Sequence, residues 1–432
     1  GTSVGSAQRM KEVAKLITDG EQKIVVLSAM SGTTNTLVEI SDYLYKKNPE
    51  GANEIINKLE AKYKQHVDEL YATQEYKQKG LEVIKSHFDY IRSYTKDLFT
   101  LFEEKVVLAQ GELISTAMVN FYLQECGVKS VLLPALEFMR TDKNAEPDPV
   151  YIKDKLRAQL DLYPDTEIYI TQGFICRNAY GEIDNLQRGG SDYTASLIGA
   201  AVNASEIQIW TDIDGMHNND PRIVDKTAPV RQLHFEEAAE LAYFGAKILH
   251  PTCIQPAKYA NIPVRLLNTM DPEAPGTLIS NDTEKGKIKA VAAKDNITAI
   301  KIKSSRMLLA HGFLRKVFEI FESYQTSIDM ICTSEVGVSV TIDNTKHLNE
   351  ILDDLKKYGT VTVDKEMCII CVVGDLEWEN VGFEAKALDA MRDIPVRMIS
   401  FGGSNYNISF LIRECDKKVA LQSLSDMLFN GK

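Results

Sequence analysis

The chain has 432 residues, enough for two or three domains that each bury their own core. Hydrophobic residues make up 44% of it and charged residues 25%, which is typical of a soluble globular protein. The formal charge of −12 argues against a general binder of nucleic acid or of anionic membranes, and no apolar run has the roughly 18 residues of a membrane span.

Seven cysteines are scattered along the chain, and two of them form a C-x-x-C pattern in the strand-like run 368–373. Side chains three positions apart on a strand point to opposite faces, so Cys368 and Cys371 are expected to be buried small hydrophobes, without a shared metal or disulfide. The first five residues lack the basic flank and apolar stretch of a signal peptide. These features predict a reducing, cytoplasmic location and no metal site.

The first predicted element is a buried parallel strand at 23–29, followed by the loop 30–35. A helix is expected to begin near Thr34 or Asn35, because both are good N-cap residues. Residues 51–104 contain no proline and carry apolar residues at helical spacing. This pattern predicts two long helices that stand off the main sheet.

Short strands then alternate with helices. Such alternation indicates an α/β domain with a mainly parallel sheet, in which ligands bind beyond the carboxyl ends of the strands. The predicted strands are 129–133, 166–171, 206–210 and 263–267, and the predicted helices are 110–125, 150–160, 191–203, 235–245 and 251–260.

A segment rich in proline, glycine and polar residues at 271–287 marks the predicted domain boundary. Beyond it, one pattern occurs twice. A Gly-Phe pair opens a helix at Gly312 and again at Gly382, and each helix is followed by two strands, at 326–331 and 338–342 and then at 395–400 and 407–412. The repeat predicts two small α+β modules with a role in binding or regulation.

Residues 188–194 (Arg-Gly-Gly-Ser-Asp-Tyr-Thr) precede a helix of small residues. The two glycines let backbone amides approach a ligand closely, and a helix N-terminus favours a carboxylate or phosphate. Arg188 could grip a carboxylate through two parallel hydrogen bonds. An ordinary glycine turn, with Ser191 or Asp192 as the N-cap residue, explains this segment equally well.

Residues 210–215 and 218–222 form a strand end followed by an acid-rich loop. Asp212 and Asp220 could approach a magnesium–nucleotide complex, and Arg222 could meet a phosphate. The alternative is a turn-rich loop in which the aspartates cap the backbone.

Two further segments have weaker signals. Lys247 stands alone in an apolar run and is either a snorkelling surface residue or a phosphate ligand, while His250 before Pro251 is expected to cap or pack. Glu112 follows Gly111 at an expected helix start. Its carboxylate could pair with a substrate ammonium or simply favour the helix dipole.

Taken together, these segments resemble aspartate kinases of the amino-acid-kinase superfamily over nearly the whole chain. The matching motifs are residues 1–5 (Gly-Thr-Ser-Val-Gly), 28–35, 111–112, 171–174, 188–194, 210–212, 220–222 and 244–247. The resemblance implies a catalytic αβα sandwich with a mainly parallel sheet at 1–283, carrying the helical insertion at about 51–104. It also implies a regulatory pair of ferredoxin-like ACT modules at 284–432, either divided near residues 363 and 364 or interleaved.

The implied reaction is transfer of the γ-phosphate of ATP, bound with Mg²⁺, to the side chain of L-aspartate, in the pathway to lysine, threonine and methionine. The resemblance assigns the α-carboxylate of aspartate to Arg188, its ammonium to Glu112, and a catalytic role to Asp192 together with Arg188. The same pocket would be lined by Thr34, Phe174 and Ser191. The nucleotide would lie against Gly189, Gly190, Thr211, Asp212, His217, Arg222 and Lys247. Arg188, Arg222 and Lys247 would give this acidic protein one cationic cleft.

Two departures from the family pattern carry expectations of their own. In the family, a Lys-Phe-Gly run on a first strand precedes the loop at 1–5, and its lysine neutralises phosphate charge. The sequence begins after that run, so we expect severely reduced turnover without it. His217 stands where a tyrosine often lies beside the nucleotide base.

The second half of the resemblance implies regulation. ACT modules bind amino acids at interfaces between chains, so a homodimer or larger assembly and inhibition by lysine are expected. The residues that match the lysine-binding pattern are Met307, Gly312, Phe313, Leu314, Ser327, Ile328, Asp329, Thr333, Ser334, Glu335 and Val336. Ala310 replaces a serine of some relatives. The alternatives are a related kinase for glutamate, a uridylate or carbamate, and a non-catalytic amino-acid sensor.

Overall fold

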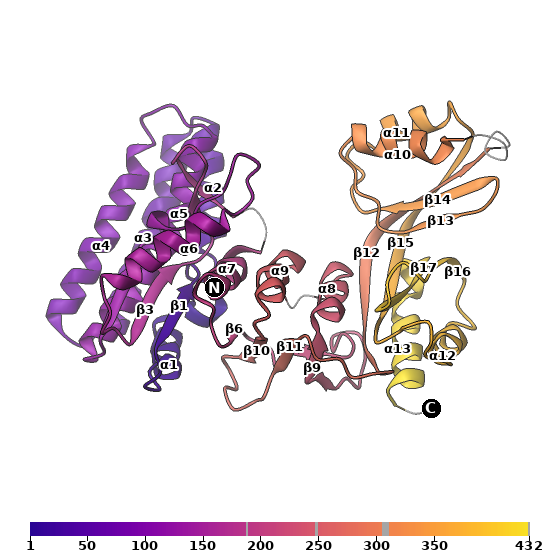
Figure 1. Ribbon diagram of the computed structural model, residues 1–432. Coiled ribbons are helices and arrows are strands. Elements are labelled where there is room, and N and C mark those ends of the chain that lie inside the picture. Colours follow the sequence, from indigo (N-terminus) through magenta and orange to yellow (C-terminus); the bar gives the residue numbers. More distant parts are fainter. Residues whose placement is uncertain (187–188, 247–248, 305–310, 431–432) are drawn as a thin grey trace. The chain divides into compact units, whose positions relative to one another are not determined.

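The computed structural model describes residues 1–186, 189–246, 249–304 and 311–430. It divides into two compact units (Figure 1). Unit 1 comprises Gly1–Gly215 and Leu249–Asn281, and unit 2 comprises Met216–Ile248 and Asp282–Lys432. The chain therefore leaves unit 1 after Gly215, returns to it at Leu249 and leaves it again after Asn281. The expected domain boundary between residues 283 and 284 remains a prediction.

The first sheet of unit 1 is parallel, with the strand order β1-β3-β2. Its central strand is buried along its whole length. Ile168 and Ile170 pack into the core formed with helices α1 to α5, whereas Tyr169 packs with residues of α6 and α7. Helices therefore cover both faces, as buried parallel strands require. The strands are β1 (Lys23–Leu27), β2 (Ser130–Leu133) and β3 (Ile168–Gln172).

The second sheet of unit 1 pairs β6 (Ile207–Thr211) in parallel with β10 (Val264–Asn268). β11 (Thr277–Ser280) runs antiparallel to β10. Helix α7 (Gly190–Val202) contacts both β1 and β6 and packs against α9 (Pro251–Ala260). The predicted αβα architecture with mainly parallel strands is confirmed. The remaining elements are η2 (Ala135–Glu137), α6 (Pro149–Asp161) and the hairpin of β4 (Ile175–Arg177) and β5 (Ile183–Asn185).

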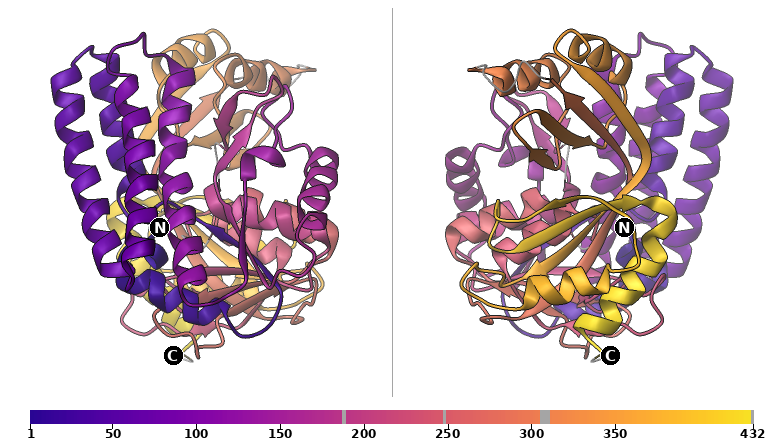
Figure 2. Two further views of the ribbon diagram at one scale, coloured as in Figure 1. Left: turned by 90° about the vertical axis from the view of Figure 1, so that its left-hand side faces the viewer. Right: turned by 90° about the vertical axis from the view of Figure 1, so that its right-hand side faces the viewer.

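Long helices form the remaining layer of unit 1 (Figures 1 and 2). α3 packs against α2 and α4, and α5 packs against α4 and α2, so that the indigo to violet helices of Figure 2 lie side by side. The two predicted helices of the insertion are α3 and α4. The bounds are η1 (Thr2–Val4), α1 (Ala7–Ile17), α2 (Thr33–Tyr45), α3 (Pro49–Leu70), α4 (Gln74–Ser93) and α5 (Leu101–Glu125).

Helix α5 begins nine residues before the predicted start at 110, because Thr100 and Glu103 form a capping box at its N-terminus. By length and composition it could cross a membrane, which corrects the expectation that no segment is apolar enough. However, 72% of its most apolar window is buried inside unit 1. Its apolar character is therefore that of a core helix.

Unit 2 is built on one antiparallel sheet with the strand order β13-β14-β12-β15-β17-β16. Two long strands, β12 (Ile288–Lys303) and β15 (Thr360–Gly374), serve both halves of it. Helices α10 and α11 cover one half and α12 and α13 the other. The other bounds are α10 (Phe313–Ser323), β13 (Ile331–Thr333), β14 (Gly337–Ile342), α11 (Leu348–Leu355), α12 (Phe383–Ala390), β16 (Val396–Ser400), β17 (Asn407–Arg413), η4 (Glu414–Asp416) and α13 (Lys417–Leu428).

The predicted β-α-β-β repeat is present in this sheet. Strand β13 starts at Ile331, later than the predicted 326, because the amide of Met330 donates to the side chain of Thr341 in place of a regular ladder partner. Cys368 and Cys371 are free and buried in β15, as predicted.

Unit 2 also contains the segment between residues 216 and 248. Its helix α8 (Phe235–Tyr243) packs against β12 and β15. The short strands that precede it are β7 (Met216–His217), β8 (Pro229–Val230) and β9 (Gln232–His234).

Candidate active site

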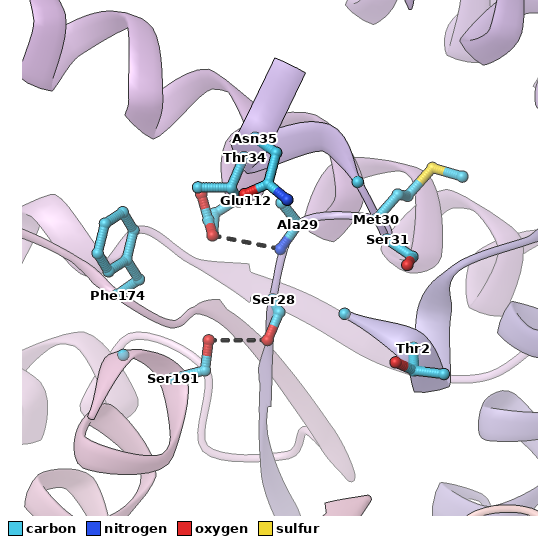
Figure 3. A pocket seen from close by; sticks show the side chains of 13 residues that line it. Thr2, Ser28, Ala29, Met30, Ser31, Thr34, Asn35, Glu112, Phe174 and Ser191 are labelled. Atoms are coloured by element: carbon cyan, nitrogen blue, oxygen red, sulfur yellow. Dashed lines mark hydrogen bonds between the residues drawn. The ribbon is translucent and has the colours of Figure 1, made fainter. Parts of the chain in front are cut away.

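A cavity of about 340 Å³ opens at the carboxyl ends of β1 and β3 in unit 1 (Figure 3). This is the edge where parallel sheets bind ligands. Five of the predicted site residues share it: Thr34, Glu112, Phe174, Gly190 and Ser191. The other lining residues are Gly1, Thr2, Ser28, Ala29, Met30, Ser31, Gly32 and Asn35.

The start of α7 forms one wall of the cavity. Its N-cap residue is Gly189, which has a left-handed backbone (φ 75°) and no side-chain cap. Ser191 and Asp192 therefore lie within the first turn, and the alternative in which one of them is the N-cap is wrong. Gly190 also has positive φ (50°), and a Cβ added there would meet open space. The helix N-terminus thus faces a space that an anion could enter.

A hydrogen bond joins this turn to the first strand. The Ser28 hydroxyl donates to the Ser191 hydroxyl at 2.8 Å (Figure 3). Phe174, which also lines the cavity, has a left-handed backbone (φ 70°) that is costly for a bulky residue. Its amide donates to the Thr194 hydroxyl at 3.0 Å, which fixes it to α7. Hydrogen bonds therefore connect α7 to the two segments that follow β1 and β3, and all three segments line the cavity.

Glu112 lies in the middle of α5 and is 3% exposed. Because α5 begins at Leu101, the alternative of a first-turn glutamate that favours the helix dipole is wrong. Its Oε1 accepts the Ala29 amide at 3.3 Å, while Oε2 has no hydrogen-bond partner (Figure 3). Burial raises the pKa of Glu112 to about 7. An ammonium group would satisfy both the unpaired oxygen and the buried charge.

Asp192 does not line the cavity itself, although its carboxylate lies within electrostatic reach of it. The Gly1 amino group has its pKa lowered by burial, and the carboxylates of Asp192, Glu112 and Asp212 act in the opposite direction. All three carboxylates therefore lie within electrostatic range of Gly1, which lines the cavity. Burial raises the pKa of Asp192 to about 6.

Thr211 is the last residue of β6, and Asp212 follows it. The carbonyl oxygen of Thr211 accepts both the amide and the hydroxyl of Thr269 at 2.8 Å. That hydroxyl lies 3.2 Å from the hydroxyl of Ser3, beside the cavity residues Gly1 and Thr2. The predicted nucleotide residues of unit 1 thus lie beside the cavity.

The other predicted nucleotide residues fall elsewhere. His217 and Arg222 belong to unit 2. His217 Nδ1 lies 2.9 Å from the Thr227 hydroxyl, and Arg222 bonds the Asp220 carboxylate at 2.9 and 2.7 Å. These bonds from Arg222 lower the pKa of Asp220. Arg188, Lys247 and Met307 lie outside the described residues.

The predicted effector residues lie on three segments of unit 2. Gly312, Phe313 and Leu314 form the start of α10, and Thr333 ends β13. Ser334, Glu335 and Val336 form the turn between β13 and β14, and Ser327, Ile328 and Asp329 precede β13. A second cavity, of about 300 Å³, is lined by Asp329 with Glu240, Tyr243, Phe244, Met330, Ser400, Gly403, Ser404, Asn407 and Ser409.

Asp329 already has a cationic partner. Its Oδ1 accepts bonds from Lys294 Nζ at 2.8 Å and from the Tyr243 hydroxyl at 3.1 Å. Lys294 also meets Asp343 at 2.9 Å. Burial raises the pKa of Asp329 despite these bonds, and the pKa of Lys294 is raised because its two carboxylate partners outweigh the effect of burial.

Comparisons with known proteins agree with this architecture. A sequence profile of the amino acid kinase family matches residues 1–268, and one of the ACT domain matches residues 370–428. The chain is 36% identical to chloroplastic aspartokinase 1 of Arabidopsis thaliana, covering 100% of this chain and 79% of the relative. It is 32% identical to lysine-sensitive aspartokinase 3 of Escherichia coli strain K12, covering 99% and 98%.

Solved structures give the same result. The crystal structure of E. coli aspartokinase III in complex with aspartate and ADP (R-state) matches with a TM-score of 0.85 at 31% identity, covering 99% of this chain and 98% of that one. The complex of that enzyme with lysine and aspartate (T-state) matches with a TM-score of 0.80 at 32% identity, over the same shares. Full-length identity above 30%, a kinase fold and a following ACT domain place this chain in the aspartokinase family.

Proposed function

We propose that the chain transfers the γ-phosphate of ATP to the side-chain carboxylate of L-aspartate, giving 4-phospho-L-aspartate and ADP. This is the first step towards lysine, threonine and methionine. The observation that carries the proposal is the cavity that Glu112, whose Oε2 has no hydrogen-bond partner, lines together with the first turn of α7. An acceptor with one ammonium and two carboxylates matches that combination of groups.

In this proposal, Glu112 receives the α-ammonium of aspartate and Arg188 its α-carboxylate. Thr34 and Ser191 supply hydroxyls to the acceptor, and Phe174 closes the wall. Arg188 immediately precedes the two glycines of the α7 start, which supports its placement at this end of the cavity. Replacing Arg188 with alanine should therefore raise the KM for aspartate far more than the KM for ATP.

In the same proposal, backbone amides and cationic side chains bind the nucleotide. Gly189 and Gly190 would donate amides to phosphate oxygens, with Asp192 organising the reacting groups beside them. Magnesium, bound with the ATP, supplies neutralisation of phosphate charge. The residues assigned around the nucleotide are Thr211, Asp212, His217, Arg222 and Lys247, with Lys247 and Arg222 as the phosphate cations. The space beside Gly190 and the helix N-terminus support the fit.

Regulation is the second half of the proposal. We expect lysine to bind the ACT region and inhibit turnover, using the residues assigned above from Met307 to Val336. A homodimer or larger assembly through the ACT modules and a cytoplasmic location belong to the same proposal. The seven free cysteines fit a reducing compartment.

ADP formation coupled to NADH oxidation tests the proposal. L-aspartate, L-glutamate, carbamate and uridylate are compared as acceptors, with and without lysine or threonine. Both the 432-residue chain and a version preceded by the Lys-Phe-Gly strand of the family are assayed. Of the four acceptors, we expect only aspartate to support ADP formation, much faster in the version that carries the Lys-Phe-Gly strand, and we expect lysine to abolish it. Turnover of another acceptor in place of aspartate would contradict the assignment.

A further inference from the structure

The loop that follows β1 forms much of the cavity wall. Met30, Ser31 and Gly32 line the cavity, and so do Thr34 and Asn35 at the start of α2. Thr33 does not line it, because its side chain is turned away from the cavity and is 1% exposed. The position of this loop therefore sets the width of the proposed acceptor site.

Helix α3 of the insertion holds the loop. The hydroxyls of Thr33 and Tyr63 lie 2.7 Å apart, and Tyr63 is 1% exposed. One residue earlier, Lys62 Nζ donates to the carbonyl oxygen of Ser31 at 3.4 Å. Within the part of the chain that the structure describes, these are the side-chain hydrogen bonds that reach residues 30–35 from another element.

The Tyr63 ring is itself fixed from the far side. Its centroid lies 5.8 Å from that of Phe88 on α4, and both residues are fully buried. Facing the loop, α5 presents Gly111, where an added Cβ would lie 2.9 Å from Ala29 and 3.1 Å from Thr33. The loop thus lies between α3 and α5, with the Tyr63 hydroxyl as its buried polar contact and Lys62 as a second, longer one.

We propose that Tyr63 is a positioning residue for the acceptor amino acid, acting through Thr33 on the wall formed by Thr34 and Asn35. This deepens the proposed function and rests on it. The helical insertion then has a role at the active site, because it fixes the loop that the parallel sheet leaves exposed at its carboxyl edge. Loss of the hydroxyl leaves Thr33 without its buried partner and lets the loop shift.

The test is Tyr63→Phe, with Tyr71→Phe as its matched control. Tyr71 is also buried in the helical layer, and its hydroxyl donates to the Met118 carbonyl oxygen at 2.7 Å, away from the cavity. Both changes remove one buried hydroxyl. We expect the KM for aspartate to rise about fivefold or more in Tyr63→Phe, with the KM for ATP and kcat within about twofold. In Tyr71→Phe, we expect both KM values to stay within about twofold of wild type. The melting temperature should fall by a similar amount in Tyr63→Phe and Tyr71→Phe, because each loses one buried hydroxyl.

A second pair of variants separates positioning from general loosening. Thr33→Val should raise the KM for aspartate as Tyr63→Phe does, whereas Thr33→Ser keeps the hydroxyl and should have a KM near that of wild type. In the double variant Thr33→Val with Tyr63→Phe, the KM for aspartate should not exceed that of the more impaired single variant. Equal aspartate KM values in wild type and Tyr63→Phe, or equal effects in Tyr63→Phe and Tyr71→Phe, would overturn the inference. A wild-type chain preceded by the Lys-Phe-Gly strand that shows no aspartate-dependent ADP formation would instead contradict the proposed function.

Discussion

The hydroxyl of Ser28 at the end of β1 donates a hydrogen bond to the hydroxyl of Ser191 in the first turn of α7, at 2.8 Å. Because Ser28 is the donor, the hydrogen of Ser191 remains available to an acceptor atom in the cavity. A substrate carboxylate oxygen is such an atom, and the N-terminus of α7 favours its charge. The two serines therefore connect the strand, the helix and the proposed acceptor.

Replacement of these serines should give graded effects. Ser191→Ala removes the donor itself and should raise the KM for aspartate about tenfold. Ser28→Ala only frees the orientation of Ser191 and should raise it about threefold. Ser41→Ala is the control, because that buried hydroxyl donates to the Leu37 carbonyl within its own helix. Initial rates at varied aspartate measure all three, and equal KM values for Ser191→Ala and Ser41→Ala would refute this role.

Glu112 should make aspartate binding depend on pH. Its pKa is raised to about 7 by burial, and only the ionised form pairs with an ammonium. At pH 6 roughly one molecule in ten would carry the charge, so the KM for aspartate should be about tenfold higher at pH 6 than at pH 8. Glu112→Gln should have a high KM that no longer varies over this range. A wild-type KM that is constant between pH 6 and pH 8 would show that Glu112 does not bind the ammonium.

Asp192 should favour turnover at the expense of stability. Its folded pKa of about 6 lies above its ordinary value of 3.8, so the folded state binds more protons and loses stability as pH rises from about 4 to 6. Asp192→Asn should therefore stabilise the protein by about 2–3 kcal/mol above pH 6, and hardly at all below pH 4. It should also lower kcat by about 100-fold or more.

Denaturant titrations at several pH values and steady-state rates measure both effects of Asp192→Asn. The exposed Asp161 at the end of α6 offers a control, since Asp161→Asn should leave both quantities unchanged. A variant with full kcat would remove Asp192 from the reaction. A stability gain that is independent of pH would contradict the explanation from burial.

Lys294 should be required for the stability of unit 2. Asp329 has a side chain that is 1% exposed, and Lys294 supplies its cation from β12. Lys294→Met should cost about 3–5 kcal/mol, because it leaves that carboxylate buried without a cation, with only the Tyr243 hydroxyl bonded to it. Adding Asp329→Asn should recover part of the loss. Lys356→Met is the control, since Lys356 and Asp353 form an exposed pair, and its cost should stay below about 1 kcal/mol. Free energies of unfolding measure these effects. Equal costs for Lys294→Met and Lys356→Met would contradict this role of Lys294.

Much of the architecture was predictable because it depends on local patterns. The strand-then-helix alternation predicted the parallel sheets, and the repeated Gly-Phe pairs marked the starts of α10 and α12. The glycine pair before Ser191 was equally compatible with a backbone anion site and with an ordinary turn, and the structure places the pair at the N-terminus of α7. The anion site itself remains a prediction. The roles of the individual site residues remain predictions, to be tested by the variants above.

Other features were not visible because they depend on contacts distant in sequence. Gly111 read as a helix start, whereas its missing side chain lets α5 approach Ala29 and Thr33. Tyr63 lies within the predicted helical stretch 51–104, and nothing local indicates a partner 30 residues away. The repeat also could not say that β12 and β15 each serve both modules, because strand pairing is decided by the assembled sheet.

The identity of the product tests the central claim most directly. An acyl phosphate reacts with hydroxylamine, so the reaction of the chain with ATP, magnesium, L-aspartate and hydroxylamine can be followed by mass spectrometry. Our account predicts aspartate β-hydroxamate in amounts equal to the ADP formed, and none without the enzyme or with L-glutamate. ADP formation that yields inorganic phosphate alone, or a hydroxamate at the α-carboxyl group, would contradict it.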